Sequence, residues 1–242
     1  MESRTSVIAQ RLQPVKRIIA VASGKGGVGK SLVASGLALY LTKKGYTVGL
    51  LDLDLSGPSS HIILGANIEN FPEEDKGIIP PKVEGIRFLS IVYYTKDKAA
   101  PFRGGDVTNI IIELLAITQW GPLDYLIIDM PPGLGEETLD VLRFLPSCEF
   151  LVVTTPSQVA LGPVRKLIQI LVEMKKPVLG VVENMKMVPS SLVEKEAARL
   201  GVRYLGSISY DTGVEQAIGD PRLLKKTGFM KDLSDAIQKL NL

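Results

Sequence analysis

The chain has one cysteine, one tryptophan and one histidine among its 242 residues. With Cys148 alone, no disulfide can form within the chain, and one copy cannot build a thiolate-rich metal site. No apolar run approaches the roughly 20 residues that a membrane span needs. Residues 1–14 lack the continuous apolar stretch that a secretory signal contains. These absences predict a cytoplasmic protein.

The net charge is also small. The 28 basic and 26 acidic side chains leave a formal charge of +2, whereas a nucleic-acid surface usually shows a dense basic stripe, so we expect no nucleic-acid partner. The composition, with 45% hydrophobic and 22% charged residues, is typical of a globular protein. We expect an N-terminal extension over residues 1–14 and a single domain over residues 15–242.

A glycine-rich loop stands between an apolar run at 17–22 and a helical pattern from Leu32 to Lys44. Its sequence is Gly24-Lys25-Gly26-Gly27-Val28-Gly29-Lys30-Ser31. This spacing predicts a P-loop, in which backbone N–H groups surround phosphate oxygens. Lys30 then reaches the β- and γ-phosphates, and Ser31 binds Mg²⁺. A turn whose glycines only relieve crowding is disfavoured, because lysine and serine follow the last glycine.

Carboxylates follow two apolar runs that read as buried strands. Residues 47–51 lead into Asp52-Leu53-Asp54, and residues 125–128 lead into Asp129 and a proline- and glycine-rich loop. Asp129 is typical of a Walker B acid, which orients the metal directly or through water. Asp54 is a candidate for positioning the attacking water, and Asp52 and Asp54 are both candidates for holding the metal shell. Either Asp52 or Asp54 can instead cap a helix or turn.

The remaining pattern alternates strands with helices. We expect an amphipathic helix over 2–13, a loop or hairpin over 72–81, and a helix over 107–119 with Asp106 as its N-cap. Further strands are predicted at 86–91, 150–154, 178–182 and 203–208, and further helices at 164–174, 191–200 and 230–240. The alternation predicts an α/β fold with a doubly wound, mostly parallel sheet flanked by helices.

Lys25 is a second lysine, directly after the first glycine of the loop. Lys30 already serves the loop's own phosphates, so Lys25 suggests action across an interface between two copies that sandwich ATP. Cations supplied by a second copy are worth about 10³–10⁵ in phosphoryl-transfer rate. We therefore expect an ATPase that is slow as a monomer and depends on a homodimer.

The loop with Lys25 resembles the deviant Walker A motif of the MinD/ParA/Mrp group of P-loop ATPases. The similarity extends over roughly residues 15–230. Within it, four further stretches resemble the Mrp/ApbC branch of this group: 52–54 with 57–59, Arg103-Gly104, 123–125 through 129–133, and 178–185. This resemblance implies an ATP-binding carrier or scaffold of iron–sulfur clusters, working as a homodimer with the cluster bridging the subunits. It also implies that Asn184 hydrogen-bonds adenine and that residues 207–211 form a second base-side loop. From its residue type alone, Asn184 can also be a helix or turn cap.

One departure from the branch limits what the resemblance implies. Its cluster-carrying members have a Cys-x-x-Cys pair after the asparagine and methionine, whereas Lys186-Met187-Val188-Pro189-Ser190-Ser191 stands here. Thiolates normally hold iron–sulfur clusters, and we expect Cys148 to pack in the core. The chain has therefore lost the carrier role, receives ligands from a scaffold or apo-protein partner, or serves a different client.

Two other functions remain open. A positioning ATPase of the MinD/ParA kind would attach to a membrane or DNA, and Phe229, Leu233, Ile237 and Leu240 share one helical face that could serve as an anchor. Such a face more often covers a protein's own core, so no stable membrane association is expected. A nucleotide-gated binding protein with negligible turnover would use residues 54–60 and 129–137 as switches to recruit a partner. The choice of ATP over GTP follows from the resemblance and from the absence of an Asn-Lys-x-Asp motif.

Overall fold

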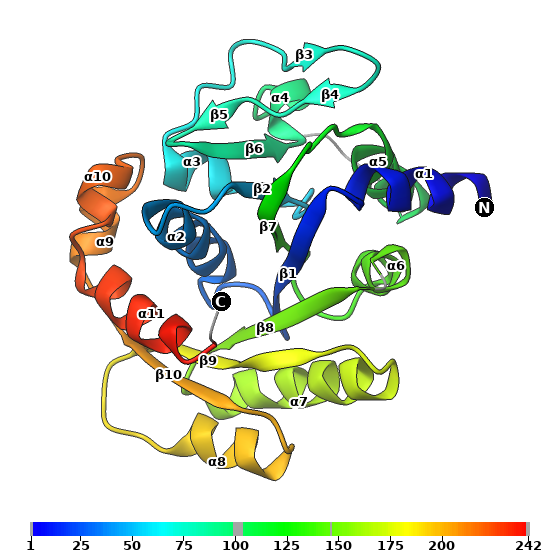
Figure 1. The fold of residues 1–242 in the computed structure, drawn as a ribbon. Coiled ribbons are helices and arrows are strands. Elements are labelled where there is room, and N and C mark those ends of the chain that lie inside the picture. The colour runs from blue at the N-terminus through cyan, green and yellow to red at the C-terminus, as the bar shows by residue number, and fades with distance from the viewer. Residues whose placement is uncertain (1, 99–103, 146, 241–242) are drawn as a thin grey trace.

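The structure is a computed structural model and describes residues 2–98, 104–145 and 147–240; Arg103 lies outside these ranges. An eight-stranded sheet forms the centre, in the order β10-β9-β8-β1-β7-β2-β6-β5 (Figure 1). Neighbouring strands run parallel, except for β5 and β6. The strands are β1 (Val15–Ser23), β2 (Val48–Asp52), β5 (Lys82–Val83), β6 (Ile86–Ser90), β7 (Leu123–Asp129), β8 (Cys148–Thr154), β9 (Val178–Lys186) and β10 (Tyr204–Ser209). The predicted fold class is confirmed.

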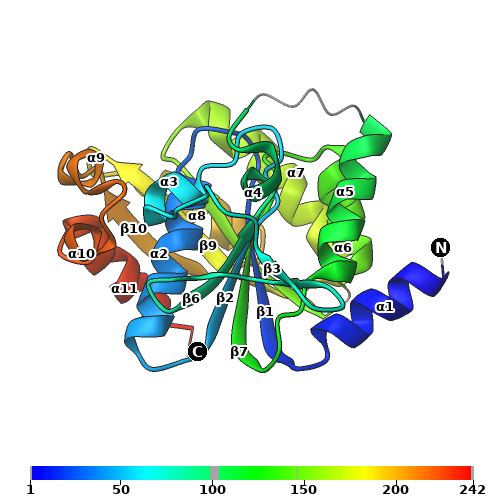
Figure 2. The same cartoon turned by 90° about the horizontal axis from the view of Figure 1, so that it is seen from above.

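Helices cover both faces of this sheet (Figure 2). One face carries α2 (Lys30–Lys43), α3 (Ser60–Leu64), α9 (Gly213–Ala217), α10 (Pro221–Leu224) and α11 (Gly228–Gln238). The other carries α1 (Glu2–Leu12), α5 (Gly104–Ile117), α6 (Glu136–Phe144) and α7 (Gln158–Glu173). Short α4 (Val92–Thr95) follows β6, and α8 (Leu192–Arg199) is joined to α7 by the Arg165–Glu196 ion pair at 2.7 Å. Strands covered on both sides must be apolar on both faces, which explains the continuous apolar runs in the sequence.

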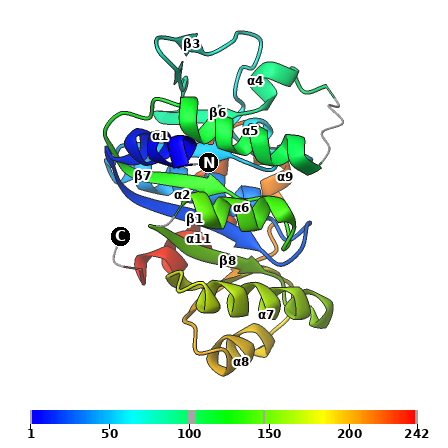
Figure 3. The ribbon, with the colours of Figure 1, turned by 90° about the vertical axis from the view of Figure 1, so that its right-hand side faces the viewer.

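The first helix is packed against the domain. Ile8 and Leu12 on α1 are buried, and Arg11 Nε donates to the carbonyl oxygen of Ala116 at the end of α5 at 3.1 Å. Figure 3 shows α1 beside α5, and the two helices are in contact. The division of the chain at residue 14 stays a prediction.

Several predicted elements have different ends. Helix α7 begins at Gln158, well before the predicted start at 164, and Pro163 lies inside it. The sequence suggests a later start because proline lacks the N–H of a helix interior. The helix forms across Pro163 because Ala160, Leu161 and Val164 around it are buried against the core. The prediction of Asp106 as an N-cap is wrong, since α5 already includes Gly104. Residues 72–81 contain the predicted hairpin, formed by β3 (Glu73–Glu74) and β4 (Ile78–Ile79).

Candidate nucleotide-binding site

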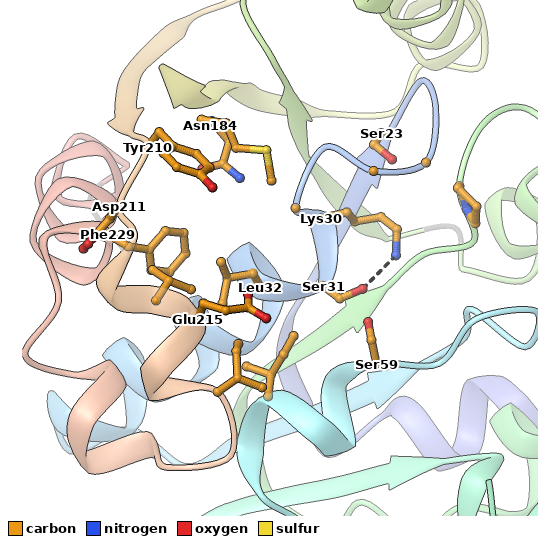
Figure 4. Close-up of a pocket in the computed structure, with 18 of the residues that line it drawn as sticks. Ser23, Lys30, Ser31, Leu32, Ser59, Asn184, Tyr210, Asp211, Glu215 and Phe229 are labelled. Carbon is orange, nitrogen blue, oxygen red and sulfur yellow. Dashed lines mark hydrogen bonds between the residues drawn. The ribbon is translucent and has the colours of Figure 1, made fainter. Parts of the chain in front are cut away.

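A cavity of about 710 Å³ opens at the carboxyl ends of the strands. Its walls come from the loops after β1, β2, β7 and β10, from the last residues of β9, and from α3, α9 and the start of α11. Figure 4 shows the two ends of this cavity. Lys30, Ser31 and Ser59 lie at one, which we call the phosphate end, and Asn184 and Tyr210 lie at the other, the far end. This edge is where open α/β sheets bind ligands.

The glycine-rich loop fits into a narrow space between α2, α7 and β9. Gly29 has φ +79° and directly precedes α2. A β-carbon on it would lie 2.2 Å from Asn184 Nδ2, and one on Gly24 would lie 2.4 Å from the backbone nitrogen of Val164. Distances below 3.0 Å essentially never occur for real β-carbons. Both glycines are therefore required by neighbours that are distant in sequence, as well as by the loop itself.

Lys30 lies at the centre of the phosphate end. Its Nζ is 2.5 Å from Asp129 Oδ1, 3.4 Å from Ser31 Oγ and 3.7 Å from Asp54 Oδ2, and Figure 4 marks its bond to Ser31. The structure thus brings four of the predicted site residues together. The carboxylates of Asp54 and Asp129 therefore neutralise the ammonium group of Lys30. A bound phosphate would be expected to take their place as its partner.

Asp129 and Asp52 are fully buried at the ends of β7 and β2. Asp129 Oδ2 accepts a hydrogen bond from Ser60 Oγ at 3.2 Å. Burial raises the pKa of Asp129, and the charge of Lys30 opposes this rise. Burial, followed by the nearby charge of Asp129, raises the pKa of Asp52 to about 8. This carboxyl pair therefore holds a proton more readily than exposed aspartates do.

Asp52, the last residue of β2, and Asp54, just after it, also organise the loop that follows this strand. Asp52 accepts hydrogen bonds from the backbone N–H groups of Asp54 at 3.1 Å and Ser60 at 3.2 Å. Asp54 Oδ1 accepts from the N–H of Gly57 at 3.1 Å. Of the two, Asp54 lines the cavity and Asp52 does not. Both therefore fill the turn-capping role that the sequence allows, while their metal and water roles stay predictions.

The phosphate end suits Mg²⁺ bound together with a nucleotide. In the described ranges, no group of three or more His, Cys, Asp or Glu side chains is placed to hold a metal. Mg²⁺ usually takes only one or two carboxylates and completes its shell with phosphate oxygens and water. Ser31, Asp54 and Asp129 surround Lys30 Nζ, so they offer hydroxyl and carboxylate oxygens of the kind that such a shell needs.

The far end of the cavity combines a predicted residue with missed ones. Asn184 lies within β9 rather than at its end, and its Nδ2 donates to the carbonyl oxygen of Val28 at 2.9 Å. It therefore ties β9 to the phosphate loop, and its contact with a base stays a prediction. Phe229 and Glu215 also line this end. Sequence reasoning assigns Phe229 only to an apolar helix face, because no local pattern shows that α11 returns to the cavity.

Lys25 lines the cavity and is half-buried. Ser23 Oγ donates to its carbonyl oxygen at 2.9 Å, which fixes the backbone of the loop. Across the residues that the structure describes, Lys25 takes part in no ion pair. Its charge is thus not used by the protein's own carboxylates, unlike that of Lys30.

The loop after β9 contains no thiolate. Lys186 Nζ donates to the carbonyl oxygen of Ser190 at 2.7 Å and to Glu183 Oε2 at 3.1 Å. Cys148 is fully buried at the start of β8, and burial raises the pKa of its thiol to about 12. The expectation that Cys148 packs in the core is confirmed. The donor set at residues 186–191 does not fit an iron–sulfur cluster.

The apolar face of α11 is covered by the protein itself. Phe229, Leu233 and Ile237 are buried, and a β-carbon on Gly36 of α2 would lie 2.7 Å from Leu233 Cδ2. These residues therefore form core packing and are not available as a membrane anchor. None of the described helices is long and apolar enough to cross a membrane.

Comparison with known proteins identifies the family. The family described as NUBPL iron-transfer P-loop NTPase, of the ParA type, matches residues 14–239. The chain belongs to this family. It is 38% identical over 233 residues to an iron–sulfur cluster carrier protein of Pseudomonas fragi, covering 87% of this chain and 81% of that protein.

Two further similarities agree with the family. The chain is 42% identical over 182 residues to the cytosolic Fe-S cluster assembly factor Nubp2 homolog 2 of Drosophila yakuba, covering 72% of this chain and 70% of that protein. A nucleotide-binding protein from Archaeoglobus fulgidus, solved in complex with ADP, superposes with a TM-score of 0.79 at 30% identity, covering 94% and 96% of the two chains. The resemblance to the Mrp/ApbC branch is confirmed, and the chain is a P-loop ATPase.

Proposed function

We propose that this chain is a Mg²⁺-dependent ATPase whose homodimer is switched by ATP and which serves iron–sulfur cluster assembly in the cytoplasm. The observation that carries the ATPase part is the meeting of Lys30 Nζ with Ser31, Asp54 and Asp129 within 2.5–3.7 Å at one end of the cavity. The cluster and cytoplasmic parts are supported by the relatives, a cluster carrier and a cytosolic assembly factor.

ATP binding would rearrange the charges at the phosphate end. The triphosphate provides the anion that draws Lys30 away from Asp129, while N–H groups of the glycine-rich loop bind the phosphate oxygens. Ser31 and Asp129 would hold Mg²⁺, which would supply positive charge for the phosphates. Asp54 remains at the cavity wall, where its carboxylate can orient the attacking water.

The homodimer is inferred from Lys25. Its charge is not neutralised by an ion pair within the described residues, and it lines the nucleotide cavity. In a dimer that sandwiches ATP, each Lys25 would stabilise the transition state in the partner's site. The Lys25→Ala variant should bind ATP with nearly unchanged affinity but lose about 10³-fold or more in turnover.

The experiment compares Lys25→Ala with Lys166→Ala, which removes an exposed lysine from α7. Steady-state phosphate release, fluorescence titration with labelled ATP, and light scattering with and without ATP separate turnover, binding and dimer formation. Unchanged turnover in Lys25→Ala would contradict the dimer mechanism. Negligible phosphate release by the unmodified chain, with normal ATP binding, would favour the nucleotide-gated binding protein instead.

The cluster role must operate without cysteine ligands from this chain. Its single cysteine is buried, and the loop over residues 186–191 offers an amine and hydroxyls in place of thiolates. We infer that a scaffold or an apo-protein client supplies the ligands. After anaerobic incubation with iron and sulfide, we expect no cluster absorbance in this chain under conditions that load a cysteine-bearing relative. A stoichiometric cluster chromophore on the isolated chain would contradict this inference.

A further inference from the structure

A second cavity, of about 480 Å³, lies on the sheet face that carries α2, α10 and α11. Its charged residues are Lys43 and Lys44 at the end of α2, Lys225 and Lys226 at the end of α10, and Lys231 on α11. We call this cavity the basic cleft. Figure 1 shows α2, α10 and α11 together on this side, and Figure 2 places them on the same face.

The basic cleft concentrates positive charge on a protein that is otherwise nearly balanced. Of the residues that line it, all of them described, five are lysines and none is acidic. Of these five lysines, only Lys225 forms an ion pair within the described residues, with Glu84 Oε2 at 3.1 Å. Lys43, Lys44, Lys226 and Lys231 are exposed. Like charges that converge in a cleft repel one another and raise the local concentration of anions.

Helix ends explain part of this arrangement. Lysines are favourable in the last turn of a helix because the backbone dipole is negative there, which accounts for Lys43 and Lys44 on α2. It does not account for Lys231, which lies near the beginning of α11, where the dipole favours acids. Nor does it explain why three separate helices direct their lysines into one cavity. The convergence indicates a binding surface.

The shape and the floor of the basic cleft select among anionic partners. Tyr40 forms part of its lining and is half-buried, so the cleft offers an aromatic surface beneath a cationic rim. A bilayer is too flat to enter a cleft, a duplex would meet the rim lysines with phosphates alone, and a bare polyphosphate would leave the aromatic surface uncovered. We propose that the basic cleft binds an acidic segment of a partner protein, in which Asp or Glu residues alternate with apolar side chains.

Helix α11 connects the basic cleft to the nucleotide cavity. Phe229 lines the nucleotide cavity, and the next residue, Met230, lines the basic cleft. The backbone N–H of Phe229 donates to Asp211 Oδ2 at 3.1 Å, and Asp211 also lines the nucleotide cavity. A β-carbon on Gly36 would lie 3.1 Å from Phe229 Cε1 and 3.2 Å from Met230 Sδ. This close packing leaves little room for one side to move without the other.

Nucleotide binding should therefore change the affinity of the basic cleft for its acidic segment. This coupling rests on the proposed function, because it requires a nucleotide beside Phe229. The docking of the acidic segment in the basic cleft does not rest on the proposed function. Coupling of 1–3 kcal/mol is typical between linked sites, so we expect the dissociation constant of the segment to change about fivefold or more on addition of an ATP analogue.

Docking is tested with a short fluorescein-labelled peptide of alternating glutamate and leucine, followed by fluorescence anisotropy. The K226E/K231E variant should bind it at least about tenfold more weakly than the unmodified chain, because two attractions become repulsions. The control K166E/K195E makes the same charge change at exposed lysines of α7 and α8 and should keep the affinity. A peptide with glutamine in place of glutamate should not bind.

Several results would overturn the proposal: no binding of the glutamate peptide, equal weakening in both double variants, or complete displacement of the peptide by phosphatidylserine vesicles or an oligonucleotide at lower concentration than by unlabelled peptide. The coupling is tested by repeating the titration with a non-hydrolysable ATP analogue. Unchanged peptide affinity, while a separate titration shows that the analogue binds, overturns the coupling. Failure of the analogue to bind contradicts the proposed function and leaves the docking result standing.

Discussion

Replacing Lys30 with methionine would keep a long side chain at the centre of the site but remove its cation. Lys30 Nζ lies 2.5 Å from Asp129 Oδ1, and the two side chains are 6% and 0% exposed. Removing one partner of a buried ion pair costs about 3–5 kcal/mol, because the other charge stays buried. Each kcal/mol shifts the melting temperature of a chain of this size by about 2–4 °C, so Lys30→Met should melt roughly 6–20 °C lower at pH 8 without nucleotide.

The loss of stability in Lys30→Met should be smaller at pH 6 than at pH 8. Burial already raises the pKa of Asp129, and Lys30 is the group that opposes this rise. In Lys30→Met the pKa of Asp129 rises further, so the folded variant binds a proton that the unfolded chain has released. Its stability is therefore greatest at low pH and falls as the pH rises through the folded-state pKa. The pH dependence distinguishes an uncompensated carboxylate from a simple packing defect.

Thermal unfolding followed by circular dichroism at pH 6 and pH 8 measures both effects. Lys166→Met, which removes an exposed lysine, should change stability by no more than about 0.5 kcal/mol. The double variant with Lys30→Met and Asp129→Asn should recover much of the loss, because the fully buried carboxylate is no longer left without a partner. Asp54, which also loses Lys30, has a side chain that is 13% exposed and still reaches water. An unchanged melting temperature for Lys30→Met at pH 8, or a double variant as unstable as the single one, would refute the reasoning.

Two further predictions concern other parts of the same site. Gly24→Ala places a β-carbon 2.4 Å from the Val164 nitrogen and 2.5 Å from the Pro163 carbonyl carbon, so we expect the affinity for labelled ATP to fall at least about tenfold. Gly105→Ala, where nothing lies within 4 Å, is the control, and an equal loss in both would contradict the explanation. Since burial raises the pKa of Asp52 from 3.8 to about 8, the folded protein holds a proton that the unfolded chain releases, and the Asp52 contribution to stability is lost as pH rises from about 4 to about 8. Asp52→Asn should reduce this fall in the unfolding free energy with pH, as measured by urea unfolding at a series of pH values, while Asp129 still contributes to it. An unchanged pH dependence would show that another group titrates.

The sequence predicts those parts of the site that depend on local patterns. A lysine and a serine after a glycine-rich loop specify phosphate and Mg²⁺ binding through the conformation of one turn and the start of one helix. The acids after buried runs can be placed at the same edge, because parallel strands end together. The lack of a thiolate pair after Asn184 is equally local, and the residue types alone are enough to limit the cluster chemistry.

Element ends are less certain, because tertiary contacts override local preference. Pro163 indicates a boundary in the sequence, yet it lies inside α7, where it removes one interior hydrogen bond. Ala160, Leu161 and Val164 around it are buried, and their packing on the core offsets this loss. Strand β9 continues to Lys186 because pairing with β10 supports it beyond the apolar run. Asn184 is consequently a strand residue that binds the phosphate loop.

By itself, the sequence determined the α/β class, the phosphate loop and the absence of cluster ligands, because each is set by residue types a few positions apart. Only the tertiary structure decided that Lys30 neutralises Asp129, that Phe229 completes the nucleotide cavity, and that lysines from three helices share one cleft. Contacts between distant segments depend on how the helices cross the sheet. Side-chain periodicity fixes which face of a helix is buried, but not the neighbour against which it packs.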